Sequence, residues 1–138
     1  MIVAIDKDFN RIHIEDAVAK QECYCPYCGE RLFQKKGEIR RHHFSHMPKS
    51  VCKDTWADSY DMSDWHYDVP KDNQEVLLAL GEIKHRADVL IGRTVTEFQR
   101  SNMSSKAFSD RNNFYFNLGY KVIWVFDFQE QYASGRLW

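Results

Sequence analysis

The sequence has no long hydrophobic run and no excess of charge of either sign. No apolar stretch reaches the length of a membrane span, and no signal peptide opens the chain, so we expect a cytoplasmic protein that does not enter a membrane. The formal net charge of −1 excludes bulk basicity as a sign of nucleic-acid binding, although a local basic face is compatible with that total. The length of 138 residues suits one domain, or a small domain with an appendage.

Cysteine is scarce and confined to the first 52 residues, at Cys23, Cys25, Cys28 and Cys52. In a reducing compartment, such clustering favours a metal site over disulfides. Cys25 and Cys28 are separated by two residues and followed by Gly29, so one tight turn can aim both sulfur atoms at one ion. We therefore predict a structural zinc site, and the alternative is a pair of ordinary buried thiols.

The other zinc ligands are expected from the histidine-rich segment that follows. The stretch "KKGEIRRHHFSH" is typical of a hairpin around Gly37, and on an extended strand His42 and His46 share one face while His43 lies on the other. The ligands that we favour are Cys25, Cys28, His46 and Cys52. His43 is the main substitute for one of the last two. A closed site of four ligands has no open position, so its ion would stabilise a small module rather than catalyse a reaction.

The same segment is basic, with cations at Lys35, Lys36, Arg40 and Arg41. Two interpretations stay open at this point. The segment is either a solvated hairpin or a finger whose cations contact the phosphate groups of a nucleic acid.

Alternating apolar segments and turns predict an α/β chain of mixed α+β character. The first 14 residues are typical of a β-hairpin. The elements predicted after the cysteine-rich segment are a helix around 62–69, strands at 75–80, 84–91 and 94–100, a helix from 101 or 104 to about 118, and a strand at 120–128. The order is thus helix, three strands, helix, strand.

Two carboxylates stand on neighbouring strands of that pattern. Asp88 lies in the second strand and Glu97 in the third, beyond a two-residue turn, and Gln99 shares the strand face of Glu97. Converging carboxylates suit Mg²⁺, which keeps waters and substrate oxygens as its other ligands. The alternative is that both acids pair with nearby arginines on an exposed sheet.

These motifs together resemble the CoiA-like competence proteins. The run "HRADVLIGRTVTEFQRS", followed by "FSDRNNFY" and "GYKVIWVFD", is similar to their nuclease domain. The segment "CPYC…HHFSH" resembles their N-terminal zinc-ribbon-like region, and "MSDWH" resembles the motif between the two. The resemblance covers about residues 20–128. It implies a restriction-endonuclease-like, or PD-(D/E)XK, fold and a metal-dependent DNA nuclease that acts in DNA uptake, recombination or defence.

The resemblance also implies roles for individual side chains. Asp88 and Glu97 would hold a catalytic Mg²⁺ or Mn²⁺, and Gln99 takes the place of the lysine that is usual in the wider superfamily. His66 and Glu75 would lie near this site. The downstream motif is matched by Ser101, Arg111 and Tyr115.

Arg86 or Lys84 could supply the positive charge that a lysine brings and Gln99 lacks. Alternation along the strand places Arg86 on the face of Asp88, which makes it a better candidate than Lys84. The side chains that we expect to contact DNA are Arg86, Arg111, Ser101, Lys35, Lys36, Arg40 and Arg41.

We expect three regions: an N-terminal β-hairpin at 1–20, a zinc-ribbon-like module at 21–58 and a nuclease-like domain at 59–138.

An alternative to the nuclease is a catalytically weak or inactive module that binds DNA or assembles with a partner protein, which Gln99 and the neutral charge would suit. A third interpretation is a zinc-stabilised protein-interaction domain. The strandedness of the DNA stays open, a protein partner could supply specificity, and an oligomer is compatible with the sequence.

Overall fold

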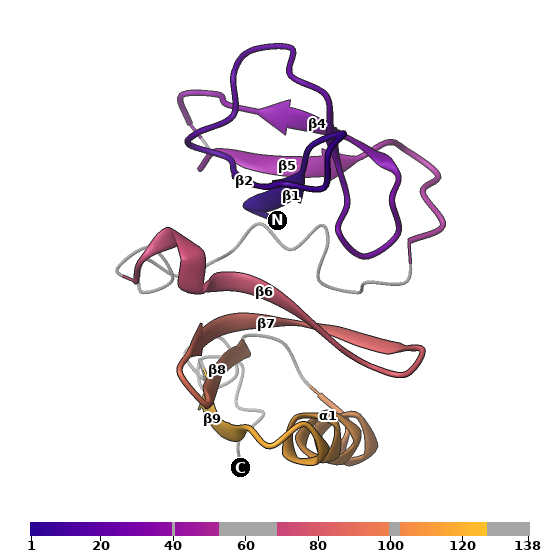
Figure 1. Cartoon of the computed structure of the whole chain (residues 1–138), viewed down its shortest axis with the longest axis vertical. Helices are drawn as coiled ribbons and strands as arrows, with labels where there is room; N and C mark the ends of the chain where they lie inside the picture. Colours follow the sequence, from indigo (N-terminus) through magenta and orange to yellow (C-terminus); the bar gives the residue numbers. More distant parts are fainter. Residues whose placement is uncertain (40, 53–68, 100–102, 127–138) are drawn as a thin grey trace, which may run out of the picture.

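The computed structural model describes the chain apart from residues 40, 53–68, 100–102 and 127–138. The described part is a mixed α+β structure with two β-sheets and one α-helix, which confirms the predicted class. A five-stranded sheet from the first 46 residues lies on one side, and a four-stranded sheet with helix α1 lies on the other (Figure 1). The helix predicted around residues 62–69 falls almost entirely outside the described residues.

The first sheet has the strand order β2-β1-β3-β4-β5. Its strands are β1 Val3–Ile5, β2 Arg11–His13, β3 Cys23–Tyr24, β4 Arg31–Lys35 and β5 His43–His46. β1 and β2 form the predicted hairpin, whose turn is closed by the Asp6 carboxylate: it accepts hydrogen bonds from the N–H groups of Asp8 and Asn10 at 2.8 and 2.9 Å. β1 also pairs with β3, so the hairpin and the cysteine-rich strands share one sheet.

Strands β4 and β5 form the second predicted hairpin. Leu32 pairs with His46 and Gln34 with Phe44, and buried Leu32 and Phe44 direct this face towards the core. The intervening pairs therefore present the opposite face. We call the five-stranded sheet with its connecting loops the first module, and the four-stranded sheet with α1 the second module. The core of the first module is built from Met1, Ile2, Val3, Ala4, Ile14, Ala17, Cys23, Cys25, Leu32 and Phe44.

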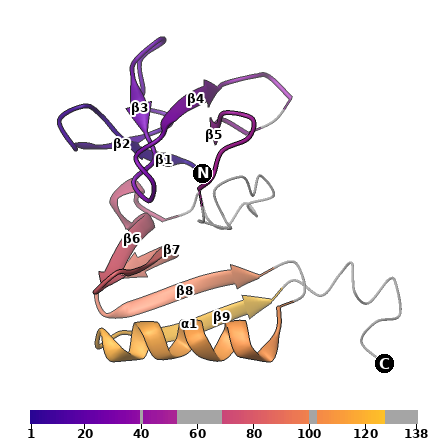
Figure 2. The same cartoon turned by 90° about the vertical axis from the view of Figure 1, so that its right-hand side faces the viewer.

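The second sheet has the order β6-β7-β8-β9. A short 3-10 helix, η2 Lys71–Asn73, leads into β6 Gln74–Leu80, β7 Ile83–Ile91, β8 Thr94–Gln99, α1 Ser105–Asn117 and β9 Lys121–Phe126. Three strands, a helix and a strand follow one another as predicted. β6, β7 and β8 are antiparallel neighbours, whereas β9 lies parallel to β8, so α1 serves as the crossover connection (Figure 2).

Local signals fix the ends of α1. The Ser104 side chain caps its first turn by accepting a hydrogen bond from the Ala107 N–H at 3.1 Å. At the other end, Gly119 adopts a φ of 86°, and the Tyr120 N–H returns to the Tyr115 carbonyl at 3.0 Å. The helix packs Phe114 and Tyr115 against Ala87 and Val95, which fixes its position over β7 and β8.

Polar contacts join the two sheets. The Arg11 guanidinium binds the carbonyl groups of Lys71, Gln74 and Glu75. His13 Nε2 lies 2.9 Å from Gln74 Oε1, and because His13 Nδ1 accepts from a backbone N–H, Nε2 is the protonated donor. At the other end of the second sheet's first hairpin, Lys84 Nζ donates to the Tyr27 carbonyl at 2.6 Å.

Candidate metal centre and active site

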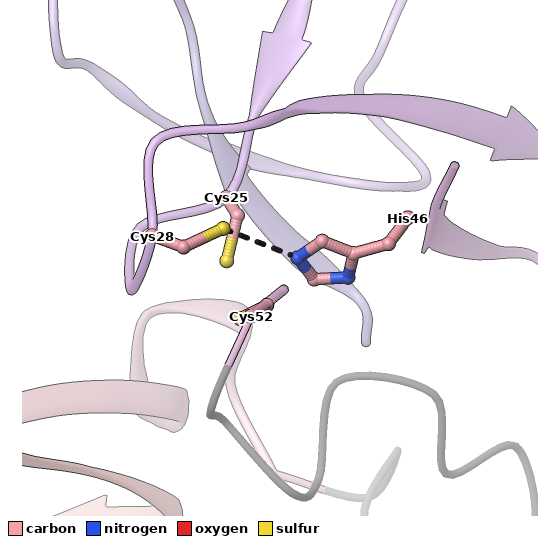
Figure 3. A group of neighbouring side chains, drawn as sticks. All are labelled: Cys25, Cys28, His46 and Cys52. Atoms are coloured by element: carbon pink, nitrogen blue, oxygen red, sulfur yellow. Dashed lines mark hydrogen bonds between the residues drawn. The ribbon is translucent and has the colours of Figure 1, made fainter. Parts of the chain in front are cut away.

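Three cysteines and one histidine converge at the edge of the first sheet. Cys25 and Cys28 come from the β3–β4 turn, His46 ends β5, and Cys52 follows six residues later. One potential ligand atom of each residue lies within 4.8 Å of the others, and Cys28 Sγ is 3.4 Å from His46 Nε2 (Figure 3). These are the four residues that we favoured from spacing, and the group could hold a structural metal ion.

The β3–β4 turn is shaped to present two sulfur atoms. Gly29, at a φ of 78°, lets the turn close with a hydrogen bond from its N–H to the Cys25 carbonyl at 2.8 Å. The Tyr27 N–H then points at Cys25 Sγ, 3.3 Å away, and the Glu30 N–H points at Cys28 Sγ, 3.4 Å away. Backbone donors aimed at sulfur stabilise thiolates, which are the ligands that a metal binds.

The electrostatics of this cluster also suit a cation. Burial raises the pKa of the Cys25 and Cys28 thiols, and the charge of neighbouring cysteines raises each pKa further. A bound divalent cation would offset that repulsion and favour the thiolate form. A donor set of three sulfur atoms and one imidazole nitrogen fits tetrahedral zinc.

His43 and Cys23 are placed elsewhere. His43 pairs with Lys35 on the other face of β5, and its Nδ1 lies 2.8 Å from the Arg41 carbonyl. Cys23 is fully buried in the core of the first sheet. The alternative ligand His43 is therefore outside the group of four.

The two carboxylates meet where β7 and β8 part. The ladder between these strands ends at the pair Val89 and Thr96. Beyond it, the Asp88 carboxylate accepts a hydrogen bond from the Phe98 N–H at 2.8 Å, and the Asp88 N–H points at Glu97 Oε2 at 3.4 Å. Bonds between side chain and backbone thus replace ladder bonds, and they hold both carboxylates at one position.

Helix α1 covers Glu97 from the other side. Glu97 is 1% exposed, and its Oε1 accepts a hydrogen bond from the Tyr115 hydroxyl. Arg111, one helical turn earlier on the same face, is buried and lies close enough to interact with Glu97 electrostatically. A carboxylate, a hydroxyl donor and a guanidinium are therefore grouped between β8 and α1.

Burial is the main cause that raises the pKa of Glu97 well above its usual value, and the negative charge of Asp88 acts in the same direction. The Tyr115 hydrogen bond and the Arg111 charge oppose this rise. Burial, together with the charge of Glu97, also raises the pKa of Tyr115, which keeps its hydroxyl protonated as a donor. A buried acid whose charge is disfavoured by a neighbouring carboxylate is an electrostatic setting in which a cation binds well.

Gln99 lies on the same buried face of β8 as Glu97. It is 5% exposed and pairs with Phe126 in the parallel strand β9. Because α1 runs antiparallel to β8, Arg111 lies nearer to the Gln99 end of this face than Tyr115 does.

Arg86 and Glu75 lie at the junction of the sheets. Arg86 Nη1 is 3.3 Å from Glu75 Oε1, and both side chains are at most 5% exposed. The other Glu75 oxygen accepts a hydrogen bond from the Ile2 N–H. Arg86, expected to face DNA, is thus directed into the protein against Glu75.

The backbone at Glu75 is unusual for a strand. Its φ of 47° lies in the left-handed region, which interrupts the regular alternation of carbonyl groups along β6. As a result, Arg11 can bind the consecutive carbonyl groups of Gln74 and Glu75. Neither charge pattern nor periodicity signals this contact, because it joins residues more than 60 positions apart.

The remaining predicted residues divide into two groups. Lys35, Lys36 and Arg41 are exposed on the first module, and Lys36 Nζ donates to the Ala17 carbonyl at 2.5 Å. Arg40, His66 and Ser101 lie outside the described residues.

Comparison with protein families gives two matches in chain order. Residues 7–54 match the family described as competence protein CoiA, N-terminal domain. Residues 71–136 match the family described as competence protein CoiA, nuclease-like domain. Neither the curated proteins nor the solved structures gave a match. Within the described residues, none of the helices has the length and apolar character that crossing a membrane requires.

Proposed function

The chain belongs to the CoiA-like competence proteins, and from this premise we propose that it is a metal-dependent deoxyribonuclease of the PD-(D/E)XK type. It would act in DNA uptake, recombination or defence, in the cytoplasm, where a thiolate cluster is not oxidised. The observation that carries the proposal is the convergence of Asp88 and the buried Glu97 beneath Tyr115 and Arg111.

In this proposal, Asp88 and Glu97 hold Mg²⁺ or Mn²⁺. A bound ion of this kind supplies an activated water and neutralises charge on the scissile phosphate. Tyr115 holds Glu97 Oε1 in place, so the carboxylate needs no reorientation when the ion arrives. The Phe98 N–H does the same for Asp88.

In this proposal Gln99 and Arg111 together replace the lysine that is usual in the wider superfamily. The Gln99 amide can orient the attacking water or a phosphate oxygen, but it brings only a dipole. Arg111 brings the positive charge next to Glu97, whereas Arg86 forms an ion pair with Glu75. Glu75 and Arg86 are then positioning residues that hold the start of β6 against β7. Arg86 lies two residues before Asp88 in β7.

The second cluster, at Cys25, Cys28, His46 and Cys52, would hold a structural Zn²⁺. All four ligand positions are filled by protein atoms, so this ion would stabilise the first module. The exposed cations Lys35, Lys36 and Arg41 of that module would contact DNA.

One observation favours a second function. The uncharged Gln99 stands where a lysine is usual, which would suit a catalytically inactive site in a module that binds DNA or assembles with a partner protein. A protein partner that supplies specificity is compatible with either function.

Cleavage of labelled single- and double-stranded DNA tests the proposal. The protein is loaded with zinc and assayed with Mg²⁺, with Mn²⁺ or with neither; a chelator is avoided because it would also remove zinc. Asp88→Asn and Glu97→Gln should abolish cleavage, whereas Glu82→Gln, an exposed acid in the β6–β7 turn, should not change it. If the folded wild type does not cut in any of these conditions, the nuclease proposal is overturned.

A further inference from the structure

The outward face of β4 and β5 combines an aromatic ring with positive charge. Cross-strand pairing places Phe33 beside Ser45 and Lys35 beside His43, all on the face away from the core. Phe33 is 44% exposed, and Lys35 Nζ lies 6.0 Å from the centre of its ring. Phe33 shares the lining of one groove with the exposed Ile39 and Met47, so the exposed apolar surface here is a patch rather than a single side chain.

Phe33, Lys35, His43 and Ser45 of this face line the groove, which has a volume of about 1120 Å³. The groove is also lined by Lys36 and the 99% exposed Ile39, which follow β4, and by Met47 and Lys49, which follow β5. The lining combines apolar side chains with lysines that come from both strands' ends, Lys35 and Lys36 at the end of β4 and Lys49 after β5. Among the described lining residues, three lysines oppose one acid, Glu38, in a protein whose net charge is −1.

Charge and shape select one class of occupant. An apolar groove alone would suit a peptide, but the three lysines in the lining favour a flexible polyanion that also carries flat aromatic rings. A single nucleic-acid strand has these properties, because its unpaired bases expose faces that stack on aromatic side chains. In a duplex these faces are covered by neighbouring bases.

We propose that this groove binds single-stranded nucleic acid, with a base stacked on Phe33 and adjacent phosphates held by Lys35 and Lys49. The inference deepens the proposed function by naming the strand type. Its geometry is independent of the carboxylates, which lie in the other sheet. In this arrangement the first module captures a strand, and the second module acts on it.

Fluorescence anisotropy with a short labelled oligothymidylate, without added Mg²⁺ or Mn²⁺, tests the aromatic contact. Loss of one base stack should weaken binding by Phe33→Ala about 5- to 150-fold. Phe33→Tyr should restore it, because the ring is kept. The matched control is Phe9→Ala in the β1–β2 turn, where Phe9 is 82% exposed and outside the groove, and it should bind like the wild type.

An abasic oligonucleotide separates stacking from charge. Phe33→Ala should bind this probe as the wild type does, whereas Lys35→Ala should bind both probes more weakly. Each lost phosphate contact should reduce the slope of log affinity against log salt by about 0.7. Lys7→Ala, an exposed lysine of the first hairpin turn, serves as the control for charge.

The outcomes are distinguishable from those of the nuclease proposal. If folded, zinc-containing Phe33→Ala binds oligothymidylate like the wild type, or if the duplex binds as tightly as the single strand and responds equally to Phe33→Ala, the groove proposal is overturned. An oligouridylate arm shows whether DNA or RNA is preferred, and a Phe33-dependent loss in either arm supports the groove. Binding that depends on Phe33 without any cleavage would leave the groove intact and remove the nuclease.

Discussion

Replacing Tyr115 with phenylalanine should weaken metal binding at the carboxylate pair. The substitution removes only the hydroxyl that donates to Glu97 Oε1, and it keeps the ring that packs in the core beneath α1. The bond is fully buried, so water cannot replace the lost donor. Outer partners of metal ligands are worth about 10- to 100-fold in metal affinity, and that is the loss we expect.

Titration calorimetry with Mn²⁺ on zinc-loaded protein measures this effect directly. Tyr24→Phe is the control, since Tyr24 also donates to a carboxylate, that of Glu22 at 3.1 Å, but in an exposed position where the bond contributes little. The cleavage rate of Tyr115→Phe at saturating Mn²⁺ should recover most of the wild-type value. Unchanged Mn²⁺ affinity in a folded Tyr115→Phe protein would refute the reasoning that Tyr115 holds Glu97 for a metal.

Three further predictions concern stability and zinc. The pKa of Glu97 is raised in the folded state, so this carboxyl group destabilises the fold once the pH rises above its pKa in the unfolded chain. Glu97→Gln should therefore raise the Tm of the metal-free protein by about 2–6 °C at pH 8 and by less at pH 5. Equal shifts of the Tm at both pH values would contradict this. Cys28→Ser should lose bound zinc, measured by mass spectrometry, whereas Cys23→Ala should keep it, because Cys23 lies outside the cluster. Glu75→Gln leaves Arg86 buried beside a neutral amide and should cost about 3 kcal/mol in urea unfolding, and a change below about 0.5 kcal/mol would show that the ion pair is not needed.

Local pattern was sufficient for the elements of the second sheet. The predicted strands at 75–80 and 84–91 differ from β6 and β7 by one residue at their starts, because alternation and the turn at Gly81 are local signals. The four residues of the candidate metal centre could also be predicted, since a two-residue spacing and a strand face indicate where the sulfur atoms of Cys25 and Cys28 and the imidazole of His46 point.

Long-range contacts were not accessible in the same way. Arg86 and Asp88 are two residues apart in β7, so alternation predicts that Arg86 lies beside the carboxylates. In the structure its buried partner is instead Glu75, whose left-handed backbone and contact with the first sheet no local pattern predicts. No periodic pattern in the sequence predicts the hydrogen bonds of Arg11 to the carbonyl groups of β6, because they depend on how the two sheets meet. The resemblance identified Tyr115 as part of a motif, but its hydroxyl bond to Glu97 depends on the register of α1 against β8.

The register of α1 against β8 limits where residues can be inserted in the chain. α1 delivers Arg111 and Tyr115 to Glu97 from one face, and each residue inserted ahead of Arg111 within the helix would rotate both side chains by about 100° around its axis. A single insertion there would point the hydroxyl and the guanidinium away from the carboxylates, although composition and hydropathy would be almost unchanged. An insertion in the β6–β7 turn, which touches neither cluster, would lengthen the hairpin and leave them in place. Spacing, more than residue type, is therefore what a variant of this helix must preserve.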